Sequence, residues 1–521
     1  MLKTLQQAMA TDRDYPARTA RVQWLGGVLD GSMYECLPYE FHEETEPSGA
    51  YIPLAERRPS VRYNLCRVIV NDSVSMLFSE GHFPTPQADD EETAHALVKV
   101  IADSKLNEVM VDAATRGSVG SVAILMRVLG NRAFFSALPT AYLSPAWRPD
   151  APDVLESVTE QYKVKGAALA AQGYDVVALY KAGVTVKQPP GRGVKVDVLA
   201  DAMAADFWFR RVWDAGAENW YLPWPVLSDK PVEPAIDTER TVKHGLGFVP
   251  MVWVRNLPGG DDADGACTFE AAISTQVEIE YQLSQAGRGL KYSSDPLLMI
   301  KEPPTGNGNL IKGANALVVS KDGDAKLLEI SGSAAGAVVE YARALRSFAL
   351  EVVGGNRADA DKLATAQSGR AMELMNYALI SLADRLRASY GEGALLDLLY
   401  MVVKASQKFP LTDKHGRPIP KMNPAAEVTL NWPRWYAPTA VDRQNDATTL
   451  KTLRDSNLIS QETAIANVAD DYDIEDVAEE VARIEGDQDK AMQRLADMTP
   501  DDSREDGHGH MPVPKGDGGG E

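Results

Sequence analysis

The feature that most constrains this chain is a pair of long predicted helices that enclose a short, turn-rich insert. The first helix follows Thr268, a predicted N-cap, and runs to about Leu290, a length of roughly 35 Å. Only a narrow stripe of it is apolar, and the residues that recur at four-residue spacing are Phe269, Ile273, Val277 and Glu280–Tyr281. Because the rest of the helix is polar, it suits packing beside neighbouring copies of the chain better than burial inside one core.

The insert and the second helix follow directly along the chain. Residues 297–330 combine short β-rich runs with turn clusters, which predicts a small hairpin-rich module. The expected strands are Leu297–Ile300, Ala316–Ser320 and Lys326–Ile330. Residues 333–353 then predict an amphipathic helix that ends at Gly354-Gly355. Its apolar face consists of Val338, Ala342, Leu345, Ala349 and Val352.

The remaining C-terminal part is predicted to be mostly helical. Residues 356–368 are polar and predict a loop. A long helix is expected from about Gly369 to Tyr390, with a break or kink at Gly391-Glu392-Gly393 before it continues over 394–408. After an expected strand at 428–432, further helices are expected at 441–454, 460–468 and 473–498, the second of them capped by Ser460 or Thr463. Residues 499–521 are rich in Gly, Asp and Pro and are expected to be disordered.

The N-terminal half changes character near residue 137. Before that point, apolar spacing predicts helical segments over 62–78, 91–110 and 112–129. Between 137 and 256 short β-rich runs dominate, and five of the nine tryptophans lie between Trp208 and Trp253. This predicts an antiparallel sheet with aromatic packing across its strands, and hence an α+β fold. The expected strands are 160–164, 175–180, 183–187, 195–199, 207–213, 220–222 and 251–255.

The net charge of −21 is unevenly distributed along the chain. Residues 461–521 contain 18 acidic and 5 basic side chains, a balance of −13, so the preceding 460 residues carry only −8. A protein that grips nucleic acid through phosphate contacts usually shows a basic patch, and none is obvious in this sequence. The charge therefore argues against a tight nucleic-acid binder but is compatible with a surface that DNA slides past.

Cysteine usage and hydropathy bear on the compartment. Cys36, Cys66 and Cys267 are isolated and odd in number, which favours a reducing cytoplasm over a disulfide framework or a zinc ribbon. Residues 1–20 are polar and mixed and do not predict a secretory signal. No stretch approaches the ~20 apolar residues that a membrane span needs, so we expect no membrane partner.

The sequence shows no pattern typical of an enzymatic or metal site. No GxxxxGK[ST], HExxH, GxSxG or HxxEH motif occurs, and no GxGxxG lies between a strand and a helix. His508 and His510 are close together only within the expected tail. Acidic clusters at 89–92, 261–262, 470–471 and 479–480 are interpreted as solvated faces or helix caps. We therefore expect no catalytic residues, no metal and no cofactor.

Several segments, in their order along the chain, resemble the portal proteins of tailed bacteriophages. His244-Gly-Leu-Gly-Phe-Val-Pro250 is similar to the family strand before the stem, and Phe269–Leu290 resembles its first stem helix. Ser368-Gly-Arg-Ala371, before Glu373-Leu374, resembles the start of the long helix that follows the tunnel loop. Tyr63-Asn64 with its helix to Leu77-Phe78, and Leu458-Ile-Ser-Gln-Glu-Thr463, also look like family motifs, although the Gly that leads the last one is absent. The resemblance covers about residues 60 to 485.

The resemblance implies a portal fold, with a mixed α/β wing, a helical stem, a small β-rich clip, a long kinked helix and a helical crown. The implied wing is 1–256, the two stem helices are 257–295 and 331–353, and the clip between them is 296–330. The implied tunnel loop is 354–368, followed by the long kinked helix and wing return at 369–455, the crown at 456–498 and a disordered acidic tail at 499–521.

The resemblance also implies a homo-oligomeric ring, usually a dodecamer, at one capsid vertex of the virion, assembled in the host cytoplasm. Double-stranded DNA would pass through it non-specifically in packaging and ejection, and the ring would help to sense a full head. The expected tunnel-loop residues are Asn356, Arg357, Asp359, Lys362 and Gln367, of which Arg357 and Lys362 would touch phosphates.

The clip would meet the terminase large subunit and later the head–tail adaptor proteins. Its expected interface residues are Lys301, Glu302, Asn307, Lys312, Lys321 and Asp322. The major capsid protein and the scaffolding protein are further implied partners. ATP hydrolysis would belong to the packaging motor, which agrees with the missing nucleotide-binding motif.

Two other interpretations stay open at this point. The chain could be another phage structural protein, such as a head-completion or minor capsid component, which predicts no closed ring and no channel. It could also be a soluble multidomain enzyme without a recognisable motif, which predicts a pocket with converging, perturbed titratable groups.

Overall fold

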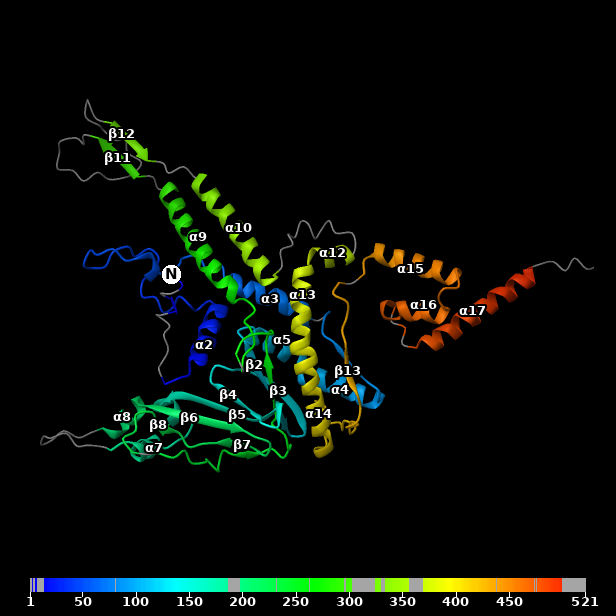
Figure 1. Cartoon of the computed structure of the whole chain (residues 1–521), viewed down its shortest axis with the longest axis horizontal. Helices are drawn as coiled ribbons and strands as arrows, with labels where there is room; N and C mark the ends of the chain where they lie inside the picture. Colours follow the sequence, from blue (N-terminus) through cyan, green and yellow to red (C-terminus); the bar gives the residue numbers. More distant parts are fainter. Residues whose placement is uncertain are drawn as a thin grey trace, which may run out of the picture. The chain divides into compact units, whose positions relative to one another are not determined.

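The computed structural model describes residues 2, 5–6, 14–79, 81–185, 197–230, 232–261, 263–294, 297–301, 324–328, 333–355, 369–436, 438–472, 474 and 476–498. The chain divides into two compact units. Unit 1 comprises Met1–Thr365 and Arg370–Tyr436, and unit 2 comprises Ala366–Gly369 and Ala437–Glu521. Figure 1 shows the elements of each unit, which are described separately below.

An antiparallel sheet covered by helices forms the centre of unit 1. Strand β2 (Ser121–Leu129) pairs with β3 (Arg132–Pro139) on one side and with β10 (Met251–Arg255) on the other. Gly130 and Asn131, with φ of 55° and 64°, supply the tight turn between β2 and β3. The surrounding helices are α2 (Ala17–Asp30), α3 (Leu65–Phe78), α4 (Glu91–Ser104) and α5 (Leu106–Gly117), with the 3-10 turn η1 (Leu54–Glu56) before α3. Their apolar side chains share one core with the sheet.

Two helix predictions in this region are wrong. The predicted helix over 91–110 is two helices, because Lys105 takes a left-handed φ of 54° and ends α4. The predicted helical segment over 112–129 ends at Gly117, and its apolar run forms β2 instead. The first six residues of β2 are all buried. A strand buried on both faces shows no alternation that would distinguish it from a buried helix.

A second antiparallel sheet in unit 1 has the order β4-β5-β6-β7-β9, with β8 paired to β6. Its strands are β4 (Leu143–Arg148), β5 (Ala151–Lys165), β6 (Asp206–Trp213), β7 (Ala217–Trp220), β8 (Trp224–Pro225) and β9 (Val242–Lys243). Tyr162 and Phe209 oppose each other in register with ring centroids 4.9 Å apart, and Phe209 meets Trp220 edge-on at 5.6 Å. The predicted antiparallel sheet with aromatic cross-strand packing is therefore confirmed.

Short helices pack at one end of this sheet (Figure 1). They are α6 (Gly166–Ala171), α7 (Val176–Gly183) and α8 (Val198–Ala204). The predicted strands over 175–180 and 195–199 are wrong, since their described residues lie in or next to α7 and α8. The side chains of Asp175 and Asp197 accept hydrogen bonds from the N–H groups three residues later, so both residues are N-caps that start helices. The β-branched residues that follow them had favoured strands. The predicted strand over 183–187 starts at the last residue of α7 and extends outside the described residues.

The predicted helix pair is present in unit 1. The 3-10 turn η2 (Glu270–Ala272) leads into α9 (Ile273–Ser294), and α10 (Ser333–Val353) returns beside it (Figure 1). Between them, β11 (Leu297–Lys301) and β12 (Asp324–Leu328) form an antiparallel pair, which agrees with the predicted hairpin-rich module, although β12 begins two residues before the expected strand over 326–330. The expected strand over 316–320 lies outside the described residues. The N–H of Gly355 donates to the carbonyl of Leu350 at 2.8 Å and Gly354 has a φ of 69°, so α10 ends where the glycine pair predicted. Thr268 is not an N-cap, because its hydroxyl accepts from the side-chain amide of Asn256 instead.

The predicted long helix is built from consecutive elements. Helices α12 (Gly369–Met375) and α13 (Tyr377–Leu386) are followed by the π-helical segment η3 (Arg387–Leu395) and by α14 (Leu396–Lys408). The predicted break at 391–393 lies inside η3. A π-helical segment interrupts the regular α-helical pattern of backbone hydrogen bonds, which accounts for the break. The expected strand near 428 is β13 (Val428–Asn431), which pairs with β1 (Thr85–Ala88).

Unit 2 is helical in its described residues. It contains α15 (Ala440–Asp455), α16 (Gln461–Val468), the 3-10 turn η4 (Ala469–Tyr472) and α17 (Val477–Met498). The hydroxyl of Ser460 accepts from the N–H of Thr463, so Ser460 is the cap of α16. Residues 499–521, the expected tail, lie outside the described residues.

The mixture of helices and antiparallel sheets confirms the α+β class. Where the chain is described, none of its helices is long and apolar enough to cross a membrane.

Candidate functional site at the base of the helix pair

Buried polar side chains of α9 attach the helix pair to the rest of unit 1. Glu280 is 1% exposed, and its Oε1 accepts from the backbone N–H groups of Tyr63 and Asn64 at 2.9 and 2.8 Å. The hydroxyl of Tyr34 donates to Oε2 of the same carboxylate. Burial raises the pKa of Glu280, although these donors oppose the shift. The carboxylate thus satisfies donors at a place from which water is excluded.

Other side chains of α9 repeat this pattern one helical turn away. Oε1 of Gln276 accepts from the backbone N–H of Cys66 at 2.8 Å, and the hydroxyl of Ser284 accepts from the N–H of Val61 at 3.0 Å. The backbone of residues 61–66 therefore runs along α9 with several of its donors paired to α9 side chains. Helix α3, which starts at Leu65, is placed by these contacts.

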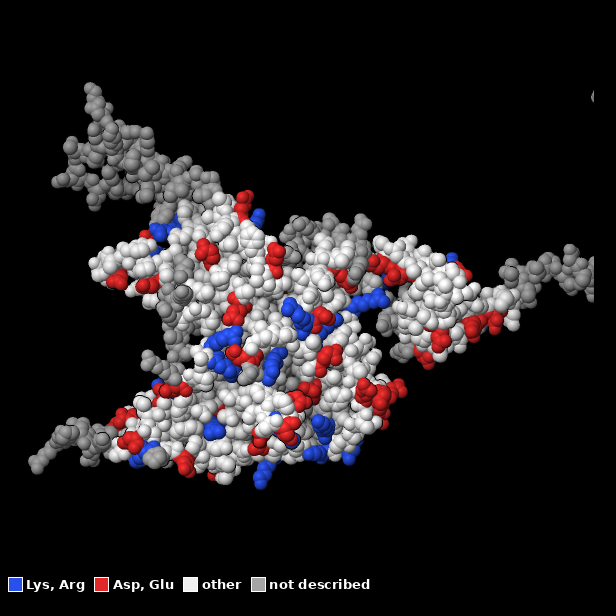
Figure 2. All heavy atoms as spheres, in the orientation of Figure 1, with Lys and Arg blue, Asp and Glu red and all other residues white. Residues whose placement is uncertain are grey.

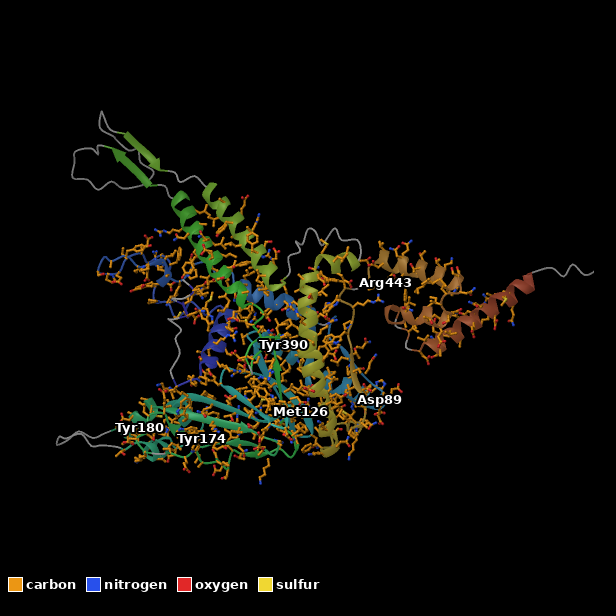
Figure 3. All side chains as sticks on the ribbon, viewed as in Figure 1. Asp89, Met126, Tyr174, Tyr180, Tyr390 and Arg443 are labelled. Atoms are coloured by element: carbon orange, nitrogen blue, oxygen red, sulfur yellow. The ribbon has the colours of Figure 1, made fainter. Side chains whose placement is uncertain are left out.

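A second buried junction joins η3 to the start of α9. Asn256, at the end of β10, is fully buried, and its Nδ2 donates to the carbonyl of Ala266 and the hydroxyl of Thr268, both at 2.8 Å. Its Oδ1 accepts from the hydroxyl of Tyr390 at 3.0 Å. Figure 3 shows Tyr390 on the helix that contains η3, which contacts β10. A Cβ on Gly117 would lie 2.0 Å from the Tyr390 hydroxyl, so this position has no room for a side chain.

The loop before α9 is held by an ion pair. Arg18, on α2, donates from Nε and Nη2 to the two oxygens of Asp264, both at 2.7 Å, and Asp264 is 3% exposed. Nη1 of the same guanidinium donates to the carbonyls of Thr140 and Leu143 at 3.0 and 2.8 Å. A bidentate pair between a guanidinium and a carboxylate holds both side chains in a defined orientation. The loop before α9 is therefore connected to α2 and, through the carbonyls of Thr140 and Leu143, to both sheets.

Segment 432–436 of unit 1 packs against η3 through cation–π contacts. The guanidinium of Arg387 lies 4.5 Å from the ring centroid of Trp432 and 3.3 Å from that of Trp435. Burial lowers the pKa of Arg387 to about 10. A Cβ on Gly391 would lie 2.2 Å from the Trp432 ring, so the glycine of the π-helical segment admits this ring.

Large apolar side chains are exposed along one face of α10. Phe348 is 62%, Val352 70% and Tyr341 48% exposed, and their spacing of seven and eleven residues places them on the same side of the helix. On other sides of the helix, Ala342, Ala349 and Leu350 are buried. Further exposed apolar residues are Leu374 and Met375, at the end of α12, and Tyr377, at the start of α13. Single exposed apolar residues are ordinary, whereas a row of large ones indicates a contact surface.

The comparison with known families decides what this arrangement belongs to. A family model described as phage portal protein, SPP1 Gp6-like, matches residues 218–494, more than half of the chain. This chain belongs to the phage portal protein family. A search of curated proteins returns no match. The matched part contains the α9–α10 pair, η3, and unit 2 almost to the end of α17. Portal proteins are structural components of the virion, so the family disfavours the enzyme interpretation.

The described residues contain no arrangement typical of a metal centre. In the described ranges, no three or more His, Cys, Asp and Glu side chains gather in a way that could hold a metal ion. A groove of about 830 Å³ is lined by parts of α2, α3 and α5. Its arginines are paired, Arg67 with Asp30 at 3.9 Å and Arg116 with Asp112 at 2.8 Å.

Nearly all of the residues predicted to form the portal site lie outside the described residues. This holds for the tunnel-loop set, Asn356, Arg357, Asp359, Lys362 and Gln367, and for Glu302, Asn307, Lys312, Lys321 and Asp322 of the clip set. Lys301 ends β11 and faces Asp324 in the register of the hairpin. The chain flanking the tunnel-loop set is described at Gly354-Gly355 on one side and from Gly369 on the other.

Sequence reasoning missed the buried polar residues that anchor α9. The sequence predicted a helix that is polar apart from a narrow stripe and that packs beside other copies, and it assigned no partners to Gln276, Glu280 and Ser284. In the structure all three are 1% exposed within unit 1. Their four-residue spacing next to the apolar stripe was the available signal, since it places them on one line along the helix.

Proposed function

We propose that copies of this chain form a closed ring, a dodecamer as is usual in the family, at one vertex of a phage capsid. Double-stranded DNA passes through the ring during packaging and ejection. The observation that carries this proposal is the exposed apolar face of α10, with Tyr341, Phe348 and Val352. In a ring, this face meets a different surface of the next copy, and repetition of that heterologous contact closes the assembly.

The domain roles follow the element order. Residues 1–256 are the wing, α9 and α10 are the stem, and the β11–β12 hairpin at the end of the pair is part of the clip. The clip, with Lys301 at the end of β11, docks the terminase large subunit and then the head–tail adaptor proteins. Residues 354–368 form the tunnel loop, where Arg357 and Lys362 touch phosphates. The wing faces the major capsid and scaffolding proteins, and residues 456–498 form the crown.

The charge distribution supports loose passage of DNA. Figure 2 shows acidic and basic side chains interspersed over unit 1 on the face that it draws, without a continuous basic surface there. In unit 2, α17 carries Glu479, Glu480, Glu485, Asp487 and Asp489. Because tight DNA binding depends on many phosphate contacts with Lys and Arg, a largely acidic ring with few basic contacts lets DNA slide.

A charge on the α10 face tests the proposal. Phe348→Glu places a carboxylate where the next copy would bury an aromatic ring, a loss of about 2–3 kcal/mol of burial at every interface before the cost of the charge. We expect purified wild-type protein to form rings, and Phe348→Glu to yield single subunits with unchanged circular dichroism. Mass photometry measures the difference.

Val98→Glu is the matched control, because Val98 is an apolar side chain that is 43% exposed and lies on α4 rather than on α10. It should form rings like the wild type. Rings from Phe348→Glu, or their loss in Val98→Glu as well, would contradict the assignment of α10 to the interface.

A further inference from the structure

A short exposed patch lies beside α9. The side chains of Val61 and Tyr63 are each 37% exposed, whereas their backbone N–H groups donate to the side chains of Ser284 and Glu280 on α9. Arg62, between them, is also exposed, and it forms no ion pair with any residue that the structure describes. The patch therefore combines two apolar side chains with one unpaired positive charge, on a backbone that α9 holds in place.

The exposed face of α10 carries the complementary combination. Tyr341 and Phe348 are large and exposed, and Ala344 lies exposed between them, about one turn from each. Glu340, next to Tyr341, is exposed and has no ion pair within the described part of the chain. A surface with an unpaired carboxylate suits a partner surface with an unpaired guanidinium, because opposite charges favour the correct pairing and like charges oppose a wrong one.

The two surfaces lie at a similar level along the helix pair. Helix α10 returns beside α9 and contacts η2, where α9 begins (Figure 1). Tyr341 lies twelve residues before the end of α10, and Ser284 lies twelve residues after η2, so both are about 18 Å from this end of the pair. Rotation about a ring axis leaves every residue at its own height. Where the pair runs along that axis, surfaces at the same level can therefore meet between neighbouring copies.

We propose that residues 61–63 of one copy receive the α10 face of the next copy, with Arg62 and Glu340 paired across the interface. Each copy uses its α10 face in one contact and residues 61–63 in the other, so that one heterologous contact repeats around the ring. The inference rests on the proposed function, and it adds which surface of the next copy meets α10.

Cysteine cross-linking of the assembled full-length protein tests which surfaces meet. The double variant Val61→Cys, Ala344→Cys, treated with a short bismaleimide cross-linker, should give a ladder of covalent oligomers on a denaturing gel. Neither single variant should give more product than the wild type, whose three native cysteines set the background. The double variant Val98→Cys, Ala344→Cys is the matched control and should give no ladder, since Val98 is exposed on α4.

Exchange of the two charges tests the ion pair. Glu340→Arg places two cations at the contact and should raise the protein concentration needed for ring formation about fivefold, the equivalent of one exposed ion pair. Burial raises the pKa of Glu280, and the charge of Arg62 is among the groups that oppose the shift, so Arg62→Glu also acts within its own chain. The combination of Arg62→Glu with Glu340→Arg isolates the contact between copies and should restore ring formation.

The outcomes separate this inference from the proposed function. Rings without the cross-linked ladder, or a ladder of equal yield in the Val98→Cys control, would overturn the assignment of residues 61–63 and leave the ring itself standing. Cross-linked dimers from Ala344→Cys alone would place α10 against another α10 or a native cysteine, and would overturn it as well. A double charge variant that assembles no better than Glu340→Arg would overturn the pairing of Arg62 with Glu340. Wild-type protein that never forms rings would refute the proposed function and this inference together.

Discussion

The Glu280 carboxylate allows the sharpest test of how α9 is anchored. Glu280→Ala removes the acceptor of two backbone N–H groups, those of Tyr63 and Asn64, and of the Tyr34 hydroxyl. Glu280→Gln keeps an oxygen in the position of Oε1, which accepts from both N–H groups, and its amide can donate to the Tyr34 oxygen. The two substitutions therefore separate the loss of the acceptor from the loss of the charge.

The size of the effect follows from the number of donors left unpaired. A buried donor that loses its acceptor costs about 1–3 kcal/mol, so the two N–H groups alone give roughly 2–6 kcal/mol for Glu280→Ala. Burial of the charged carboxylate is unfavourable and raises the pKa of Glu280. Removing that charge in Glu280→Ala therefore offsets part of the destabilisation. We expect a net local destabilisation of at least about 2 kcal/mol, and less than about 1 kcal/mol for Glu280→Gln.

Amide exchange measures this quantity at the residues concerned. Because 1.4 kcal/mol corresponds to about a factor of ten, peptides covering 61–66 should exchange roughly 30-fold faster or more in Glu280→Ala. In Glu280→Gln they should stay within about fivefold of the wild type. Glu278→Ala is the control, because its carboxylate accepts from the Gln282 side chain at 2.8 Å and from none of the donors in question.

Three results would contradict the conclusion that Glu280 anchors residues 61–66 to α9. Exchange over 61–66 that is unchanged in Glu280→Ala would show that the carboxylate does not hold these donors. The same acceleration in Glu278→Ala would indicate a general loosening of α9. Glu280→Gln that behaves like Glu280→Ala would show that the charge, and not the acceptor geometry, carries the anchor.

The remaining predictions concern the other junctions and the pH response. Gly117→Ala should cost about 1–3 kcal/mol or more of the free energy of unfolding, because its Cβ would lie 2.0 Å from the Tyr390 hydroxyl. Combined with Tyr390→Phe it should cost less than the sum of the single changes, and additive losses in urea denaturation would contradict the clash. Gly391→Ala should displace Trp432 from η3, seen as a change in tryptophan fluorescence; an unaltered spectrum would count against that packing. The pKa of Glu280 is raised above its ordinary 4.5, so its contribution to stability is full below about that pH and is lost as the pH rises through the folded value. The stability of the wild type relative to Glu280→Gln should therefore fall as the pH rises above about 4.5, and a flat difference would contradict burial of the carboxylate.

Local sequence signals predicted the parts of the fold that depend on neighbouring residues. The bounds of α10 follow from its apolar periodicity and from Gly354-Gly355, and both are confirmed. The break near Gly391 was predicted from the glycines, although only the structure shows that it is π-helical and that Trp432 occupies the space. A hairpin-rich module between α9 and α10 was predicted from its β-rich runs and turn clusters, and the β11–β12 pair is its described part.

The failures depend on contacts that are distant along the chain. The run that forms β2 is buried on both faces by β3, β10 and the helices, and an all-apolar run does not reveal whether it is strand or helix. The buried anchoring role of Glu280 was not predicted, because its partners, Tyr34, Tyr63 and Asn64, lie more than two hundred residues away along the chain.

Electron microscopy of the purified protein, with mass photometry on the same sample, tests whether copies of this chain close into a ring. We expect rings with a central hole and a mass near that of a dodecamer of the 56.6 kDa chain. A protein that remains monomeric at every concentration, or that assembles without a central hole, would contradict it.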